Sequence, residues 1–409
     1  MVIHFTHLRP YHLARFKSAE DAFSGTGIEV QGLALVDACG DLPADLPIAR
    51  PSRAPLILFA NQEPGRLEAW CSTILAMDKL RPRAVAICGY ATPDALACLW
   101  WCHRNDAKAI LMTETREQDG PRPCWKEWVK SKIVRRFNGA LCGGSEARAY
   151  LEKLGMPANR IKEGYDVVDN DYFANEAQRH RNTDPPVAPY FLGSGRFIPR
   201  KNYGFLIEAY AAYVRQSPIS SPQSAIWNLC LLGDGELREQ LIALCHHLDL
   251  NVIESAPWES SPTSDSSFQF SGPSVSASSS ATVFFPGWRS HAELPRFYAH
   301  AGAFVHPAIS EPWGLVVNEA MAAGLRILIS NNTGASTIPT LCSDYGQLLD
   351  IATLESASLQ LSNFVTRFEN SGNTDSHLLP PRLINPATTP AFGEGLGDLL
   401  NVLRKGAAL

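Results

Sequence analysis

The feature that most constrains the fold is a repeated alternation of short apolar runs with longer amphipathic segments. In the first half of the chain, the apolar runs at 2–5, 30–36, 84–88, 109–112 and 140–142 predict buried strands, and the segments at 13–23, 66–80, 94–105 and 125–137 predict helices. Such an alternation favours a parallel sheet covered by helices.

The same alternation restarts after a polar break at 175–189. Strands are predicted at 190–192, 229–232, 283–285, 303–306 and 327–330, and helices at 202–214, 237–248, 292–300 and 315–323. The chain therefore predicts an α/β protein with two doubly wound, Rossmann-like domains, 1–180 and 181–409. Ligands of such sheets bind beyond the carboxyl ends of the strands, so we expect the site in a cleft between the two domains.

Composition excludes several classes of protein. The net charge is −5, which disfavours a nucleic-acid partner. The ten cysteines form no CxxC pair and no histidine cluster accompanies them, so we expect reduced thiols and no metal site or cofactor. No signal peptide or membrane-length apolar run is evident, and a cytoplasmic location is expected. The serine-rich stretch 255–281 predicts a disordered insertion.

One glycine-rich segment carries the charges suited to a diphosphate. It has the sequence GSGRFIPRKN over 193–202 and follows a predicted strand. Gly195 permits close approach of the backbone to a ligand, and Arg196 and Lys201 add two positive charges. A tight turn with surface cations is the alternative. A second turn, at Gly233 in GDGELR, is of a kind that many strand–helix turns share.

Two carboxylates mark the most specific segment, which runs from 306 to 321. Glu311 lies in a loop after a predicted strand, and Glu319 lies one turn into a predicted helix that begins around Leu315. Gly314 permits a turn between them. Because the first N–H groups of a helix attract anions, the two acids fit acceptors for sugar and ribose hydroxyls better than a catalytic acid pair.

Taken in order, these motifs resemble the GT4-type family of retaining glycosyltransferases, which have the GT-B fold. The resemblance covers roughly residues 190–350, apart from the insertion. It rests on GRFIPRKN, GDGELR, VFFPGW (283–288), the helix at 293–298 and EPWGLVVNEAMAAG, and upstream on Gly164-Tyr165-Asp166 through Tyr172-Phe173. Several motifs in the correct order are far more specific than one.

The resemblance implies a role for each matching residue. Arg196, Lys201 and Glu311 would be catalytic, the two cations neutralising the leaving diphosphate and Glu311 contacting hydroxyls of the donor sugar. Glu319 would bind the ribose, and Gly287 and Trp288 would edge the base pocket, with core packing as the equal alternative for Trp288. The residues expected to bind the donor are Gly195, Gly233, Gly287, Trp288, Pro312, Trp313, Gly314, Leu315 and Glu319.

The family reaction implies a nucleotide-sugar donor and no metal. A UDP-sugar is favoured, with GDP-mannose as the alternative, and the acceptor is a glycan, a lipid-linked sugar or a small molecule. Asp169-Asn170-Asp171 matches the DxD metal motif of the other glycosyltransferase fold, but it lies outside any nucleotide-binding turn. Another GT-B activity, as an epimerase or phosphorylase, and a catalytically degenerate binding subunit are the alternative functions.

The N-terminal half resembles the family less clearly. His7, Arg9 and His12 follow the first predicted strand and are candidates to contact phosphate or acceptor, although His12 could equally cap its own helix. Glu114 stands where many relatives carry a histidine, and it is the fourth acceptor-side candidate.

The segment 124–137 predicts an amphipathic helix with two sides. Trp125, Trp128, Ile133 and Phe137 mark the apolar side, and five lysines and arginines occupy the rest. A peripheral membrane contact is one interpretation. A helix that faces the core and has a solvated basic side is the favoured alternative.

Overall fold

The computed structural model describes residues 1–39, 42–43, 45–60, 62–184, 188–216, 226–259, 281–338, 346–370 and 388–405. The chain divides into two compact units. Unit 1 comprises Met1–Tyr172, Pro312–Glu319 and Ile384–Leu409, and unit 2 comprises Phe173–Glu311 and Ala320–Leu383. Each unit is described by itself.

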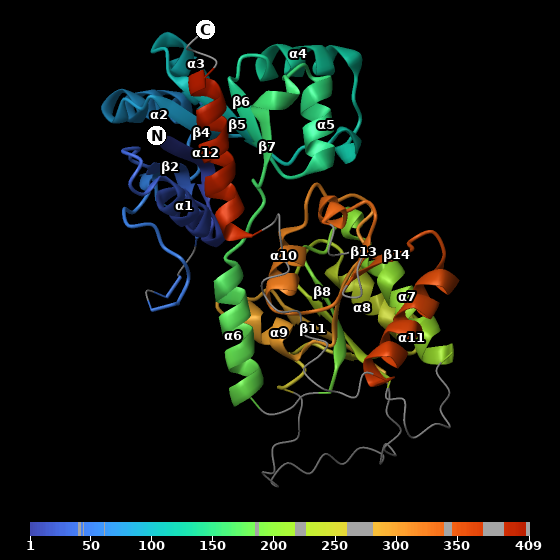
Figure 1. The fold of residues 1–409 in the computed structure, drawn as a ribbon. Helices are drawn as coiled ribbons and strands as arrows, with labels where there is room; N and C mark the ends of the chain where they lie inside the picture. The colour runs from blue at the N-terminus through green and yellow to red at the C-terminus, as the bar shows by residue number, and fades with distance from the viewer. Residues whose placement is uncertain are drawn as a thin grey trace. The chain divides into compact units, whose positions relative to one another are not determined.

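Unit 1 is built on a seven-stranded parallel sheet of order β3-β2-β1-β4-β5-β6-β7 (Figure 1). The chain runs outward from β1 to β3, then returns past β1 to β4, so the strand order reverses between β1 and β4. The elements are β1 (Val2–Leu8), α1 (Pro10–Phe23), β2 (Gln31–Asp37), β3 (Leu56–Phe59), α2 (Arg66–Leu80), β4 (Ala84–Cys88), α3 (Pro93–Arg104), β5 (Lys108–Thr113), α4 (Cys124–Val134), β6 (Gly139–Cys142), α5 (Ser145–Lys153), β7 (Ile161–Glu163) and α12 (Thr389–Lys405).

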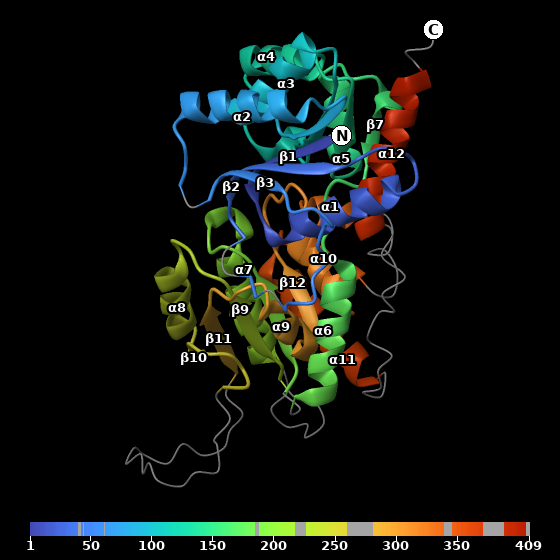
Figure 2. The same ribbon diagram turned by 90° about the vertical axis from the view of Figure 1, so that its left-hand side faces the viewer.

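Two helical layers cover this sheet (Figure 2). Helices α2, α3, α4 and α5 share one hydrophobic core with strands β1, β2, β4, β5, β6 and β7, so they lie on the same face. Helices α1 and α12 pack against each other: the Ser18 hydroxyl donates a hydrogen bond to the Thr389 carbonyl oxygen at 2.7 Å. Because both faces are covered, the central strands are almost wholly apolar.

Unit 2 repeats the architecture with a seven-stranded parallel sheet of order β10-β11-β9-β8-β12-β13-β14. Here the strand order reverses between β8 and β12. The elements are α6 (Asn170–Thr183, of which Phe173 onward belongs to this unit), β8 (Tyr190–Ser194), α7 (Tyr203–Gln216), β9 (Asn228–Leu232), α8 (Arg238–His247), β10 (Asn251–Ile253), β11 (Thr282–Gly287), α9 (Leu294–His300), β12 (Ala303–His306), α10 (Leu315–Ala322, of which Ala320 onward belongs to this unit), β13 (Ile327–Ser330), β14 (Gly346–Leu349) and α11 (Leu354–Asn370).

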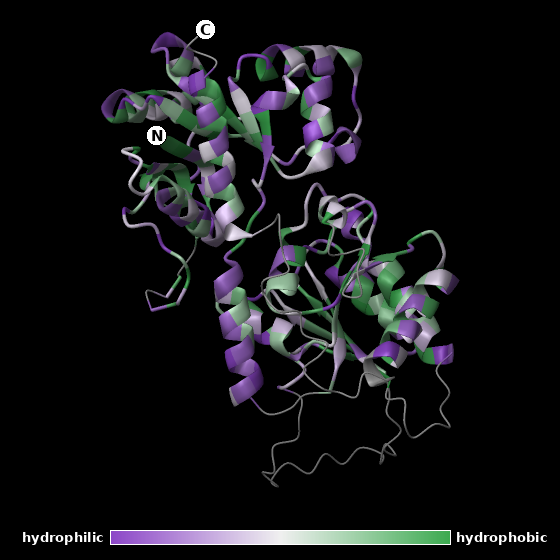
Figure 3. Cartoon of the chain, viewed as in Figure 1, coloured by the Kyte–Doolittle hydropathy of each residue, from purple (hydrophilic) through white to green (hydrophobic). Residues whose placement is uncertain are grey.

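The predicted fold class, two doubly wound α/β sheets, is confirmed. The polar break expected at 175–189 is helical for most of its length, because α6 continues through it as far as Thr183. Helix α6 is hydrophilic along almost its whole length (Figure 3). It buries only a narrow side, at residues such as Phe173 and Ala177, so its apolar periodicity is too sparse to reveal a helix.

The last helix belongs with unit 1, although the sequence placed it in 181–409. Its buried residues, Phe392, Leu396, Leu399, Leu400 and Leu403, recur every three or four positions. Such a pattern predicts one apolar face but does not say which sheet the face covers. Most of the serine-rich insertion predicted at 255–281 lies outside the described residues.

Within the described part of the chain, no helix is both long and apolar enough to cross a bilayer. The cytoplasmic location stays a prediction.

Candidate functional site

The reversal of strand order in unit 2 brings two loops together at the carboxyl ends of β8 and β12. The Ile309 N–H donates to the Arg200 carbonyl oxygen at 2.8 Å, and the Asn202 side-chain amide donates to the Pro307 carbonyl oxygen at 3.2 Å. Asn202 has a φ of 61°, which ends a 3₁₀ turn over Pro199–Lys201 just before α7. Switch points of this kind are the usual ligand sites of doubly wound sheets.

An ion pair joins these loops. The Lys201 ammonium donates to Glu311 Oε2, and only about a tenth of either side chain is exposed. Arg200 Nη1 lies 3.9 Å from Glu311 Oε1, and His306 Nε2 lies 3.6 Å from Glu311 Oε2. One carboxylate is thus surrounded by two cations and a buried imidazole.

Burial and charge act in opposite directions on these groups. Burial alone would raise the pKa of Glu311, but the neighbouring His306 ring and Lys201 ammonium lower this pKa to about 2. Burial lowers the pKa of Lys201, and Glu311 counteracts part of this effect. Burial, with Lys201 and Arg200 nearby, also lowers the pKa of His306, so its ring is neutral at pH 7. The cluster therefore holds two full positive charges against one carboxylate.

Three glycine turns lie beside this cluster, at the ends of β8, β9 and β11. The Gly195 N–H donates to the Leu232 carbonyl oxygen at 3.0 Å, and the Gly233 N–H donates to the Gly287 carbonyl oxygen at 3.1 Å. At Gly233, with φ of 142°, a Cβ atom would lie 2.0 Å from the Gly195 carbonyl oxygen. Only glycine fits there. The turns at Gly195, Gly233 and Gly287, three of the expected donor-binding glycines, therefore pack backbone against backbone.

Two of the expected site residues, the catalytic candidate Arg196 and the donor-binding candidate Trp288, are exposed. Arg196 is exposed and close enough to Lys201 to lower its pKa. Trp288 follows Gly287 and is 74% exposed. Core packing is therefore wrong for Trp288, and a role at the edge of the base pocket stays a prediction.

The segment Pro312–Glu319 follows Glu311 directly and packs within unit 1. The Trp313 indole N–H donates to Asn318 Oδ1 at 3.2 Å, and the Asn318 amide donates to the Asp166 carbonyl oxygen at 2.9 Å. The Trp313 side chain is buried, and its expected part in donor binding stays a prediction. Gly314 has a φ of 98°, and α10 begins at Leu315 as predicted, which places Glu319 in the second turn.

The acceptor-side candidates of unit 1 have separate environments. His7 is exposed and lies 2.7 Å from Glu63 Oε1. The His12 ring stacks on Phe5 at a centroid distance of 3.7 Å, and its Nδ1 accepts from the Arg9 N–H at 3.1 Å. Burial, followed by Arg15 and Arg9, holds the pKa of His12 well below its usual value. His12 thus caps its own helix, the alternative that the sequence left open.

Glu114 directly follows β5 and lies beside a carboxyl group that the sequence did not single out as a site. Asp166 is 3% exposed, and Arg15 Nη2 donates to its Oδ1 at 3.4 Å. Burial and the nearby Glu114 raise the pKa of Asp166 well above its usual value, against the effect of Arg15. The GYD motif that contains Asp166 was a signal for this residue, as part of the family resemblance. Arg200 and His306 were also missed, although both lie inside quoted motifs.

The two aspartates of the DxD match have different environments. Asp169 Oδ1 accepts from the Tyr172 N–H at 3.1 Å, and its Oδ2 accepts from the Ala49 N–H at 2.5 Å, so Asp169 caps α6. Asp171 is exposed. Among the described residues, no group of three or more histidines, cysteines, aspartates or glutamates is placed to hold a metal ion.

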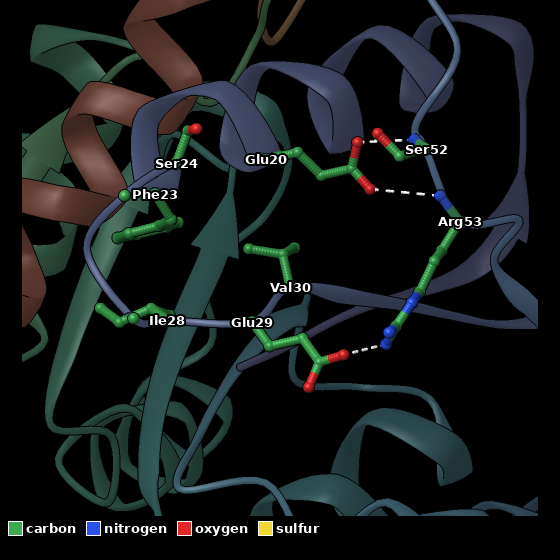
Figure 4. A pocket seen from close by; sticks show the side chains of 10 residues that line it. Glu20, Phe23, Ser24, Ile28, Glu29, Val30, Ser52 and Arg53 are labelled. Carbon is green, nitrogen blue, oxygen red and sulfur yellow. Dashed lines mark hydrogen bonds and ion pairs between the residues drawn. The ribbon is translucent and has the colours of Figure 1, made fainter.

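A separate hollow lies in unit 1, lined by residues of α1 and of the segments before β2 and β3 (Figure 4). Its charges are already paired: Glu20 accepts from the Ser52 N–H at 2.6 Å, and Arg53 pairs with Glu29. Val30 precedes β2, so the hollow lies at the amino-terminal edge of the sheet. Ligands of such folds bind at the opposite edge.

Comparison with known proteins points to one family. The profile of the family described as "Glycosyl transferases group 1" matches residues 269–341. A probable sucrose-phosphate synthase of Beta vulgaris is 25% identical over 67% of this chain and 26% of its own length. The lipopolysaccharide core biosynthesis glycosyltransferase LpsE of Rhizobium meliloti is 29% identical over 37% of this chain and 32% of its own length. The chain thus spans about a quarter of the length of the synthase.

Solved structures of the same fold cover nearly all of the chain. The Anabaena protein HepE, in complex with UDP-glucose, superposes with a TM-score of 0.64 and 16% identity, covering 98% of this chain and 99% of HepE. The lipopolysaccharide outer core galactosyltransferase WaaB superposes with a TM-score of 0.60 and 13% identity, covering 98% and 99% of the two chains. In residues 269–341 the chain is similar to the glycosyl transferases group 1, and over nearly its whole length it shares the fold of HepE and WaaB.

Proposed function

We propose that the protein transfers a hexosyl group from a nucleotide-sugar to an acceptor hydroxyl, with retention of the anomeric configuration and without a metal ion. One observation carries this proposal: the buried Lys201–Glu311 pair, flanked by Arg200, lies at the strand switch point beside the three glycine turns. This arrangement places positive charge and accessible backbone where doubly wound sheets bind ligands.

The cations would act on the leaving group. Cleavage of the glycosidic bond to the donor places negative charge on the departing diphosphate. Lys201 and Arg196 would stabilise that charge, and they would act strongly because Lys201 is desolvated and fixed before the reaction begins. These two charges replace the divalent ion that other glycosyl transfers use.

Glu311 would orient the sugar. Its carboxylate is ionised and held in place by Lys201, with a pKa of about 2. An ionised carboxylate accepts hydrogen bonds from sugar hydroxyls, and here it cannot also serve as a general acid at pH 7. The acceptor hydroxyl would then attack on the face that the diphosphate leaves, and a diphosphate oxygen would take its proton.

A UDP-sugar is the favoured donor, with GDP-mannose as the alternative. The solved structures of HepE that share the fold contain UDP or UDP-glucose. For the acceptor we propose a glycan, a lipid-linked sugar or a small molecule. Glu114, next to the buried carboxyl of Asp166, is the acceptor-side group in unit 1 that we favour most.

Thermal unfolding with UDP, GDP, ADP and dTDP, each with and without magnesium, tests the donor site. A ligand at about 100 times its dissociation constant stabilises a protein by about 2.7 kcal/mol. Stabilisation by one nucleotide, independent of magnesium and lost in Lys201→Met, supports the proposal and identifies the base. Stabilisation only with magnesium contradicts the metal-free site. No response to any nucleotide favours the degenerate binding subunit.

A further inference from the structure

Three tryptophans stand exposed on two helices of unit 1. Trp100 on α3 is 45% exposed, and Trp125 and Trp128 on α4 are 67% and 64% exposed. Each indole carries a cation over its ring at 5.4–5.6 Å, in the pairs Trp100–Arg104, Trp125–Lys126 and Trp128–Lys132. Large aromatic side chains seldom remain this exposed without a partner surface.

The tryptophans point away from the core of unit 1. Helices α3 and α4 bury their inner sides, including Trp101 and Val134, in the core shared with the sheet. Figure 2 shows α2, α3 and α4 within one helical layer of this unit. The apolar side that the sequence assigned to the core is therefore split: Phe137 packs inward, whereas Trp125 and Trp128 face solvent. The favoured alternative, a helix whose apolar side faces the core, is wrong for the two tryptophans.

The charges around the tryptophans of α4 have one sign. Lys126, Lys132, Arg135 and Arg136 are exposed. The acid of this helix, Glu127, accepts hydrogen bonds from Lys130 Nζ at 2.8 Å and from the Tyr150 hydroxyl at 2.7 Å. Burial opposes ionisation of Glu127, but these two hydrogen bonds lower its pKa. Since the whole chain carries a net charge of −5, this positive surface is a local feature.

We propose that this surface docks on an anionic lipid bilayer. The tryptophan face comprises Trp125, Lys126, Trp128, Lys132, Arg135 and Arg136, from α4 and the residues that follow it. Indoles settle at the boundary between headgroups and acyl chains, and lysines and arginines beside them attract anionic headgroups. Insertion into a fluid interface needs no complementary shape, so each indole of α4 can insert independently. A bilayer therefore fits this face better than a folded protein does.

Flotation with vesicles tests the proposal on the full chain and needs no enzymatic activity. We expect binding to vesicles of phosphatidylcholine with phosphatidylglycerol, weak binding to phosphatidylcholine alone, and a decrease in binding as salt increases. Each cation near the surface contributes about fivefold in affinity, so Lys126→Gln with Lys132→Gln should weaken binding by about 30-fold. Trp125→Ala with Trp128→Ala should weaken it by about tenfold or more, because the indoles lose their burial.

Matched controls come from elsewhere in the chain. Leu359→Ala removes an exposed apolar side chain of α11 that is 55% exposed. Arg404→Gln with Lys405→Gln removes two exposed cations of α12, which packs with α1 rather than with the layer of α2–α5. Both controls should bind vesicles as the wild type does, and circular dichroism should show all variants folded.

Three outcomes would overturn the proposal. They are the absence of binding to anionic vesicles, binding that the tryptophan and lysine variants leave unchanged, and self-association in sedimentation that only the tryptophan variant abolishes. The last would assign the face to a second copy of the chain. Because nucleotide binding is measured separately, failure of the membrane proposal and failure of the proposed transferase are distinguishable.

Discussion

Lys201 and Glu311 lie 110 residues apart in the sequence, yet they form a buried ion pair between the loops that follow β8 and β12. Burial of two charges costs hydration energy, and such a pair is often no more stabilising than two apolar side chains of similar size. The pair is therefore better explained by a ligand that needs both charges than by the stability of unit 2.

Replacement of Lys201 by methionine should affect both stability and transfer. Glu311 would stay buried without its closest cation, so we expect a loss of about 3 kcal/mol in the free energy of unfolding. Loss of a fixed charge at the leaving group should also lower kcat/KM by about 100- to 1,000-fold. Urea unfolding and steady-state kinetics measure the two effects.

The double variant Lys201→Met with Glu311→Gln separates these effects. Removal of both charges should restore most of the stability, because no unpaired ion remains buried. Activity should stay low, since the diphosphate still lacks its cation. Recovery of activity together with stability would show that the pair is only structural.

The sequence predicts best those elements and site residues whose pattern lies within one short, continuous stretch of the chain. Strands such as β4 and helices such as α2 have strong periodicity, and their predicted bounds match the structure. Glu311 and the glycine turns lie in contiguous motifs and could be named in advance. The edge strands β3 and β7 are short, and α6 and α12 are helices whose packing partners are set by distant contacts, which local periodicity does not encode.

The contacts of single side chains were harder to predict than the motifs. Trp288 and Trp313 were both assigned to the donor, but the structure buries the Trp313 side chain and exposes that of Trp288. The raised pKa of Asp166 depends on its burial and on Glu114 and Arg15, which are distant in the sequence but lie beside it in the fold. These differences arise from tertiary packing, which one sequence without its fold does not specify.

Asp184 should stabilise unit 2 in a manner that depends on pH. Its Oδ2 lies 2.7 Å from Arg296 Nε and 3.1 Å from both His180 Nδ1 and His300 Nε2. Burial would raise the pKa of Asp184, but hydrogen bonds from His300 and Arg296 lower it to about 2. Because the folded pKa lies below the unfolded value, the ionised form contributes about 2 kcal/mol above about pH 4, and this contribution is lost as the pH falls through about 2.

Asp184→Asn should therefore lower the free energy of unfolding by about 2 kcal/mol at neutral pH. The difference from the wild type should shrink between about pH 4 and pH 2, as urea titrations at several pH values would show. Glu176→Gln on α6, the helix that Asp184 directly follows, is the control. Its partner Arg179 is 54% exposed, so we expect a change within about 0.5 kcal/mol. A difference at Asp184 that persists unchanged at low pH would contradict the assignment.

His12 should remain neutral through the physiological range. Its burial and the cations Arg15 and Arg9 hold its pKa well below the usual value for histidine. The ring resonances of His12, assigned by comparison with His12→Asn, should not titrate between about pH 5 and pH 8. Any inflection of kcat/KM in that range must then come from another group. A His12 midpoint near about pH 6.5 would instead return it to the acid–base candidates.

Trp288 should bind the nucleotide base without supporting the fold. It follows Gly287, whose φ of 82° ends β11 beside the Gly233 turn, and its side chain is 74% exposed. Stacking of a base on an aromatic ring is worth about 1–3 kcal/mol, so Trp288→Ala should weaken nucleotide binding by about 5- to 150-fold. The melting temperature without nucleotide should not change, because an exposed side chain loses few contacts.

Calorimetric titration of the nucleotide into Trp288→Phe, Trp288→Ala and Leu359→Ala completes this test. A phenyl ring keeps most of the stacking surface, so affinity should fall in the order wild type, Trp288→Phe, Trp288→Ala. Leu359 is an exposed apolar residue on α11, and its replacement should change nothing. Equal affinity in Trp288→Ala and wild type would place the base away from β11. Since the Lys201→Met variant reports on the diphosphate alone, that result would move the base pocket without removing the diphosphate site.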